Sequence, residues 1–215
     1  MLERMNKSKE LGVSKETRMP SGRRLSRSTI LKVVATSLFA FALHSVGASA
    51  QGDAPTDPQI AGIVLAADQI DIDYAKLAMS KAKDQRVKDF AQQMITDHSS
   101  VSKAVSELAA KLNVSPEESE TSNSLKAQAQ EATQKLQGLE GAEFERAYID
   151  NEVAYHQAVI DATKTVLIPS AQNVDLKSAL QGATPLFEGH LQHAQRVQSA
   201  IEGRGANTAS GKSNY

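Results

Sequence analysis

The chain has 215 residues, a formal net charge of −1 and no cysteine, which excludes disulfides, thiolate metal ligands and cysteine nucleophiles. Nine of the 24 Lys and Arg, but only three of the 25 Asp and Glu, lie in residues 1–50, so the remainder carries a net charge of −7. Such an acidic remainder lacks the basic face that nucleic-acid binding needs, and we expect no nucleic-acid partner.

The first fifty residues have the pattern of a secretory signal peptide. A basic segment containing Arg23 and Arg24 precedes an uncharged apolar run over residues 33–43, and a small-x-small cleavage motif ends at Ala50. The run is shorter than the roughly 20 residues that a membrane span needs. We therefore expect export to the periplasm, with outer-membrane association left open, and no stable membrane span once residues 1–50 are removed. An uncleaved N-terminal anchor is the alternative.

The rest of the chain is predicted to form one domain. Residues 51–57 are expected to be a linker, residues 58–202 a helical bundle, and residues 203–215 a disordered polar tail. A domain of about 150 residues buries roughly 70% of its unfolded surface, so burial alone can stabilise it. No segment alternates polar and apolar residues over a useful length, which predicts an all-α fold.

The first two helices are predicted over residues 57–82 and 84–112. Asp57 is the expected N-cap of the first helix, in which Asp71 lies beside the apolar stripe and Asp68 faces outward. Apolar residues recur in the second helix with helical spacing at Val87, Phe90, Met94, Val101, Val105, Leu108 and Leu112. His98 falls on that same face, where an unsatisfied polar group would cost roughly 1–3 kcal/mol. It therefore needs a carboxylate, another histidine or a metal as its partner.

Two more helices follow along the chain. Residues 115–118 have the pattern of a capping box for a shorter helix, which ends in a loop over residues 138–141. The next long helix runs from about residue 142 to residues 168–170. Glu152 and His156 are four residues apart in it and share one side.

The last helix is predicted from about residue 174 to residue 200. Pro185 lies inside it and should kink it. After this proline, His190 and His193 occupy positions on a stripe that is otherwise apolar. The helices together predict an antiparallel bundle of four long helices, with one short extra helix in the middle connection.

Residues that can bind a metal recur on the predicted inner faces of these helices. They are Asp71, His98, Glu152, His156, His190 and His193. Side chains from facing helices can converge in a bundle core, and imidazole with carboxylate would suit one transition-metal ion such as Fe, Cu, Zn or Mn. Met94, one turn before His98, would favour copper. The alternative is a metal-free set of buried histidine–carboxylate hydrogen bonds that fix the helix register.

Several strings of the chain carry a family resemblance: residues 71–78, residues 90–98, residues 141–148, His156-Gln157, and Pro185 with His190. The most specific are Met94-x-x-Asp97-His98 and Phe144-x-x-x-Tyr148. These strings resemble a family of exported bacterial proteins catalogued as domain of unknown function 4142. The resemblance implies a ferritin-like antiparallel four-helix bundle at a periplasmic or outer-membrane location, and it brings no settled activity.

Three functional hypotheses follow. The first is an exported ferritin-like bundle protein of unknown physiological role with a buried histidine–carboxylate cluster and no catalytic residue, for which envelope stress is one setting. The second is a metal-binding protein or metal-dependent oxidoreductase that uses this cluster. The third is an interaction module that docks a protein partner or a second copy of itself. Di-iron bundles carry Glu-x-x-His pairs, whereas this chain has Glu152-x-x-x-His156, which disfavours ferroxidase activity.

Overall fold

The computed structural model describes residues 54–210, with the side chains of residues 54–203. The predicted signal peptide, most of the predicted linker and residues 211–215 lie outside the described residues. Within the described part, the chain is helical and contains no strand. The predicted all-α class is therefore confirmed.

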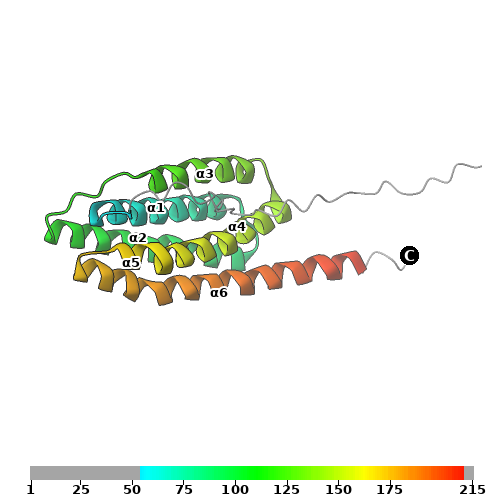
Figure 1. The fold of residues 1–215 in the computed structure, drawn as a ribbon. Coiled ribbons are helices and arrows are strands. Elements are labelled where there is room, and N and C mark those ends of the chain that lie inside the picture. Colours follow the sequence, from blue (N-terminus) through cyan, green and yellow to red (C-terminus); the bar gives the residue numbers. More distant parts are fainter. Residues whose placement is uncertain (1–53, 211–215) are drawn as a thin grey trace, which may run out of the picture. The chain divides into compact units, whose positions relative to one another are not determined.

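The described helices form a bundle of long helices joined by short connections (Figure 1). Their bounds are α1 Asp57–Lys81, α2 Gln85–Lys111, α3 Glu120–Gln137, α4 Gly141–Ala162, the π-helical turn η1 Thr163–Leu167, α5 Ile168–Ser170 and α6 Val174–Ser210. Helix α1 packs most extensively on α2, and α4 packs most extensively on α6. The bundle thus consists of two antiparallel hairpins, α1–α2 and α4–α6, with α3 packed mainly against α1.

The N-terminus of α1 is capped by the residue before the predicted cap. Thr56 Oγ1 accepts a hydrogen bond from the Gln59 backbone N–H, and Gln59 Oε1 accepts one from the Thr56 N–H. The expected cap, Asp57, instead accepts hydrogen bonds from the backbone N–H groups of Gln172 and Asn173. Asp57 therefore ties the start of α1 to the loop before α6.

The chain between α2 and α3 contains a left-handed residue and corrects one predicted capping motif. Asn113 has a positive φ of 52°, as expected for a left-handed residue at a helix end. The capping box predicted at residues 115–118 is wrong, because α3 is capped by Ser119, whose side chain accepts from the Ser122 backbone N–H. Residues 115–118 make contacts elsewhere, and these contacts override the local capping pattern.

Those contacts join the connection before α3 to the first turns of α1. The Glu117 N–H donates to the Pro58 carbonyl at 2.9 Å. At Gly62, a Cβ atom would lie 1.9 Å from the Glu117 carbonyl oxygen. This close crossing of two backbones therefore requires glycine at position 62.

The second half of the bundle departs from the expected pattern at the end of α4 and at the end of α6. Helix α4 passes into the π-helical turn η1 before the chain reverses, and no sequence pattern predicted that turn. Helix α6 extends beyond the expected end near residue 200 and reaches Ser210, so residues 203–210 of the predicted disordered tail continue it. No proline interrupts the helix there, and extending an existing helix by further residues is easier than starting one.

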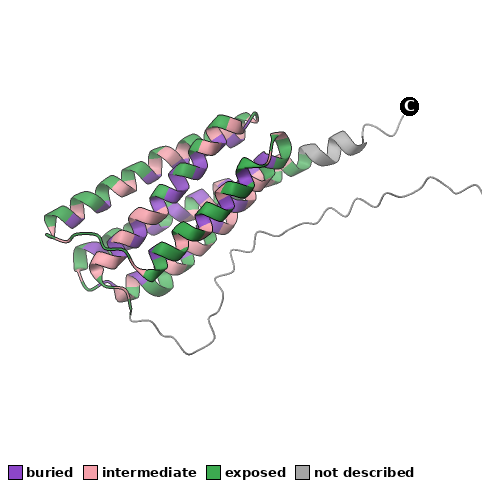
Figure 2. Ribbon diagram, turned by 90° about the horizontal axis from the view of Figure 1, so that it is seen from above, coloured by how far each residue is buried: buried purple, intermediate pink, exposed green. Residues whose placement is uncertain are grey.

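Buried apolar residues face the interior of the bundle (Figure 2) and form two clusters. Along α1, α2 and α6, one cluster ends before the other begins. On α1 the change falls between Val64 and Ile70, and on α2 it falls between Met94 and Val105. Polar residues occupy the gap on these three helices, namely Asp68, His98 and His190, and the buried Glu152 and His156 of α4 lie at the same level. The bundle therefore has a polar layer in the middle of an apolar core.

Candidate metal centre

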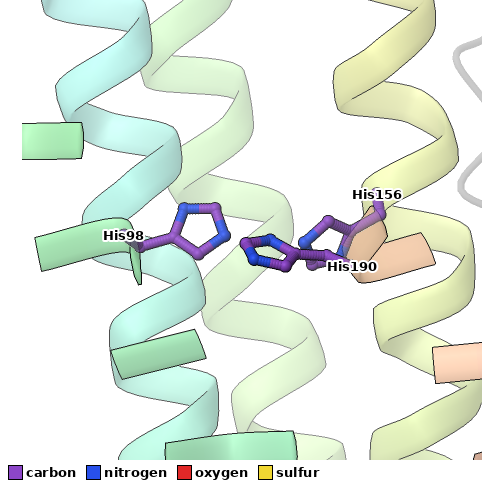
Figure 3. Close-up of side chains that lie close together, drawn as sticks. All are labelled: His98, His156 and His190. Atoms are coloured by element: carbon purple, nitrogen blue, oxygen red, sulfur yellow. The ribbon is translucent and has the colours of Figure 1, made fainter. Parts of the chain in front are cut away.

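Three histidines from three different helices meet in this polar layer: His98 of α2, His156 of α4 and His190 of α6 (Figure 3). Their ring centroids lie 5.2 to 5.6 Å apart, and each side chain is at most 3% exposed. Figure 3 shows the three rings turned toward one another. The structure thus brings together three of the histidines singled out from the sequence.

Two of these imidazoles are held in place by carboxylates. His98 Nδ1 lies 2.8 Å from Asp68 Oδ1, and His190 Nε2 lies 2.9 Å from Asp97 Oδ2. An ionised carboxylate has no proton to donate and can only accept hydrogen bonds, so each contact places a proton on that ring nitrogen. The opposite nitrogen of each ring is then left free to act as an acceptor or a ligand.

The third imidazole is held by its own helix. His156 Nδ1 donates to the backbone carbonyl of Glu152 at 3.0 Å, one turn earlier in α4. This hydrogen bond leaves the Nε2 lone pair of His156 free. An imidazole that donates one N–H to a carbonyl or carboxylate while its other nitrogen faces a shared centre has the arrangement typical of metal-binding histidines.

The three free ring nitrogens are His98 Nε2, His156 Nε2 and His190 Nδ1. All three are buried and have no hydrogen-bond partner among the described residues. One ligand atom from each of the three side chains lies within 4.8 Å of the others. The geometry therefore offers three nitrogen donors to a single position.

Two carboxylates lie beside the three histidines and form a second group of possible ligands with His156. Asp71 Oδ2 of α1 lies 3.1 Å from His98 Nε2 and 3.4 Å from His156 Nε2. Adjacent ligands around an ion with metal–ligand bonds of about 2.1 Å are separated by roughly 3.0–3.4 Å, which matches both distances. Ligand atoms of Asp71, Glu152 and His156 also lie within 4.8 Å of one another. Asp71 and Glu152 are completely buried, and their carboxylate oxygens have no hydrogen-bond partner among the described residues.

Burial and nearby charges set the protonation states of the group. Burial raises the pKa of Asp71 to about 6, and burial together with the charge of Asp71 raises the pKa of Glu152 well above its ordinary value. Burial, with the nearby imidazolium charge, lowers the pKa of His156 to about 3. For His98, burial acts to lower the pKa, but the neighbouring aspartates outweigh it and the pKa is raised. At neutral pH, His156 therefore presents an unprotonated nitrogen.

Asp68 corrects one expectation from the sequence. It was predicted to face outward, yet it is only 2% exposed and accepts hydrogen bonds from His98 and from the Ser102 hydroxyl. The signal that could have revealed it is a second buried stripe on α1, formed by Ile60, Val64, Asp68, Asp71 and Ala75. The stripe was missed because an aspartate in a helix is normally assigned to the solvent-facing side, even when its neighbours on the same stripe are apolar.

His193 lies outside both groups of possible ligands. Its Nδ1 is 2.9 Å from Gln93 Oε1, and its ring packs edge-on against Phe90 with centroids 5.2 Å apart. Gln93 Nε2 in turn donates to Asp97 Oδ2, which also accepts from His190. His193 therefore reaches the centre only through a hydrogen-bonded chain.

Two other side chains that are close in sequence to the proposed ligands have different neighbours. Met94 is fully buried in one of the apolar clusters. Glu188, which precedes His190 on α6, forms an exposed ion pair with Lys164 at 2.5 Å. Neither contact gives a reason to count these side chains among the ligands.

A family model described as Domain of unknown function (DUF4142) matches residues 43–197. The chain belongs to this family. The matched residues include all of the centre and begin inside the predicted signal peptide, and the predicted family is confirmed. No curated protein and no solved structure matches the chain. Among the described helices, none has the length and apolar character that a membrane crossing requires.

Proposed function

We propose that this DUF4142 protein binds one transition-metal ion inside its bundle, through His98, His156, His190 and Asp71, with Glu152 beside them. One observation carries the proposal. The imidazoles of His98, His156 and His190 each have one nitrogen engaged by an oxygen acceptor, and their other nitrogens are buried without a hydrogen-bond partner among the described residues.

The competing arrangement is a metal-free centre in which a proton takes the place of the metal. A proton on His98 Nε2 would satisfy the contact with Asp71 at 3.1 Å. It would leave His156 Nε2 and His190 Nδ1 buried and unpaired, and each such atom costs roughly 1–3 kcal/mol. A divalent ion can accept lone pairs from all of these atoms at once, and this favours a metal over a proton.

The donor set limits the choice of metal. Imidazole nitrogens and carboxylate oxygens suit zinc, iron, copper and manganese. His98, His156 and Asp71 supply two imidazoles and one carboxylate, which is the donor set of many non-haem iron(II) sites. This set supports a second candidate function, a metal-dependent oxidoreductase.

The location and fold family are proposed from the sequence. The basic segment, apolar run and small-x-small motif of residues 1–50 support export to the periplasm. The family resemblance supports a ferritin-like bundle, and envelope stress is the physiological setting that we propose to examine. Docking of a protein partner or of a second copy of the chain is compatible with metal binding and is a separate hypothesis.

The test of the metal proposal is the metal content of the full-length protein purified from cells. We expect one tightly bound ion per chain, measured by elemental analysis, and its loss in the double variant His98→Ala/His190→Ala. The matched control is His193→Ala, which removes another imidazole from α6 without removing a proposed ligand. The control should keep the metal content of the wild type.

A second arm tests the residue that orients His98. Asp68→Asn should weaken Zn²⁺ or Co²⁺ binding about 10- to 100-fold in a competition with a chelator. Asp73→Asn, which changes an exposed aspartate on the same helix, should bind as the wild type does. The proposal is wrong if the protein binds none of Zn²⁺, Co²⁺, Fe²⁺, Mn²⁺ and Cu²⁺, or if the double variant retains the ion.

A further inference from the structure

A cavity of about 440 Å³ adjoins the metal centre and is lined by residues of α1, α2, α3, α4, η1 and α6. Most of its wall is apolar, as in Ile63, Val105, Leu125, Val159, Leu176 and Leu180. His98 and His156 belong to the same wall. A molecule in this cavity would therefore lie against two of the proposed metal ligands.

Some polar residues of the wall lie inside the bundle and others lie at its surface. Asp68, His98 and His156 are buried, whereas Thr121, Asp161 and Thr165 are exposed. The exposed residues mark the side on which the cavity meets solvent, near the start of α3 and the end of α4. The cavity thus leads from the surface, past apolar side chains, to the imidazoles.

Ordinary packing does not account for a space of this size. Protein interiors are close-packed, and voids larger than a water molecule are few. Pockets that hold small molecules measure roughly 300–1,000 Å³ and combine an apolar wall with a few polar groups, as this one does. The π-helical turn η1 contributes Thr163, Thr165, Val166 and Leu167 to the wall, and such turns frequently occur at functional sites.

We infer that this cavity binds a small, uncharged, mainly apolar molecule that carries one hydroxyl group, such as a phenol or an alcohol. The hydroxyl group lies at the inner end of the cavity, where the Asp68 carboxylate can accept a hydrogen bond from it, because the free ring nitrogens of His98 and His156 are themselves covered. An anionic end group is disfavoured, because the wall is apolar and the carboxylates of Asp68 and Asp71 lie at the inner end. The inference rests on the proposed function only for the expected effect on a bound ion, since the cavity and Asp68 do not require one.

The first experiment compares two aromatic probes of similar size, 1-naphthol and 1-naphthoate. Each is titrated by fluorescence into the full-length protein at a pH of about 7, where the naphthoate is ionised and the naphthol is neutral. The metal-free protein and the Zn²⁺-loaded protein are both measured. We expect saturable binding of 1-naphthol to both, and binding of 1-naphthoate about tenfold weaker or less.

Two substitutions narrow the cavity from two of the helices that line it. Ala158→Leu on α4 and Ala67→Leu on α1 each add a side chain at a lining position and should weaken 1-naphthol binding about tenfold. Their matched controls are Ala154→Leu and Ala66→Leu, which change half-buried alanines of the same helices that do not line the cavity. The controls should bind 1-naphthol as the wild type does, and circular dichroism confirms that each variant folds.

A third measurement locates the hydroxyl group. Addition of 1-naphthol to the Co²⁺-loaded protein should change the visible absorption of the cobalt centre. An unchanged spectrum with saturable binding would overturn the orientation of the molecule. Absent 1-naphthol binding, equal binding of 1-naphthoate, or wild-type binding by both lining variants would overturn the ligand class or its site.

The outcomes separate this inference from the proposed function. A protein that binds metal but not 1-naphthol contradicts the cavity inference alone. A protein that binds 1-naphthol in the expected variant pattern but no metal contradicts the proposed function alone.

Discussion

At the scale of single residues, the behaviour of each histidine is set by the partner of one ring nitrogen. Asp68 holds His98 Nδ1, Asp97 holds His190 Nε2, and the α4 backbone holds His156 Nδ1. These partners fix both the ring orientation and the nitrogen that remains free. Asp68 and Asp97 are therefore as much part of the centre as the proposed ligands, although neither was predicted as a site residue.

Asp71 provides a prediction about pH in the metal-free protein. Burial raises its pKa from 3.8 to about 6, so the folded state binds this proton more tightly than the unfolded chain does. Its contribution to the free energy of unfolding is therefore fully present below pH 3.8 and is lost as the pH rises through about 6. The raised pKa of His98, to which Asp71 contributes, acts in the same direction.

The prediction is tested against Asp71→Asn by urea denaturation in the presence of a chelator. The stability of the wild type relative to the variant should increase as the pH falls from about 7 to about 4. His156 has the opposite sign, because its pKa is lowered from 6.5 to about 3 and its contribution is lost as the pH falls. Both proteins carry His156, so its contribution largely cancels in the comparison. A difference that does not change with pH would contradict the assignment.

At the scale of the elements, the connection before α3 constrains α1 more tightly than either helix pattern indicates. Its backbone crosses α1 at Gly62, and the Glu117 N–H donates to the Pro58 carbonyl there. This crossing lies on the part of α1 that carries Ile63 and Val64 into the cavity wall. The position of one cavity wall therefore depends on a contact between two backbones.

Gly62→Ala should consequently destabilise the protein. The added Cβ would lie 1.9 Å from a backbone oxygen, and relieving such a clash typically costs about 1–3 kcal/mol. The matched control is Gly182→Ala on α6, where a Cβ would meet no atom within 4 Å. That change should leave stability equal or raise it by about 0.5–1 kcal/mol, because alanine favours a helix. Chemical denaturation of both variants checks the prediction, and equal effects would refute it.

Apolar spacing predicted the helices well, because it reports which face of each helix is buried. It failed where a contact distant in sequence decides the local structure. The capping box predicted at residues 115–118 is absent because that segment contacts α1. Asp68 is buried because it accepts a hydrogen bond from a histidine on another helix. The turn at residues 163–167 contains no residue type that signals a π-helix. His193 shared the stripe of His190, and only the packed structure shows that it contacts Gln93.

At the scale of the whole molecule, the centre joins the two hairpins of the bundle. Asp71 and His98 come from the α1–α2 hairpin, and Glu152, His156 and His190 come from the α4–α6 hairpin. The two apolar clusters lie to either side of this junction. A bound ion would link the hairpins at the layer where apolar packing is interrupted.

The proposed ion should therefore stabilise the whole fold. Zn²⁺ at about 100 times its dissociation constant should raise the free energy of unfolding by about 2.7 kcal/mol, provided that the unfolded chain does not bind it. The measurement is urea denaturation with Zn²⁺ and with a chelator. His98→Ala/His190→Ala should show no such increase, whereas His193→Ala should match the wild type. An equal increase in all three proteins would indicate binding elsewhere.

The distribution of ligands over the bundle also has a consequence for biosynthesis. A ribosome completes the α1–α2 hairpin, with two of the four proposed ligands, before it has made either of the helices that carry the other two. An unfinished chain can pack this first hairpin but cannot assemble the centre. Metal capture would then be one of the last events in the maturation of the molecule.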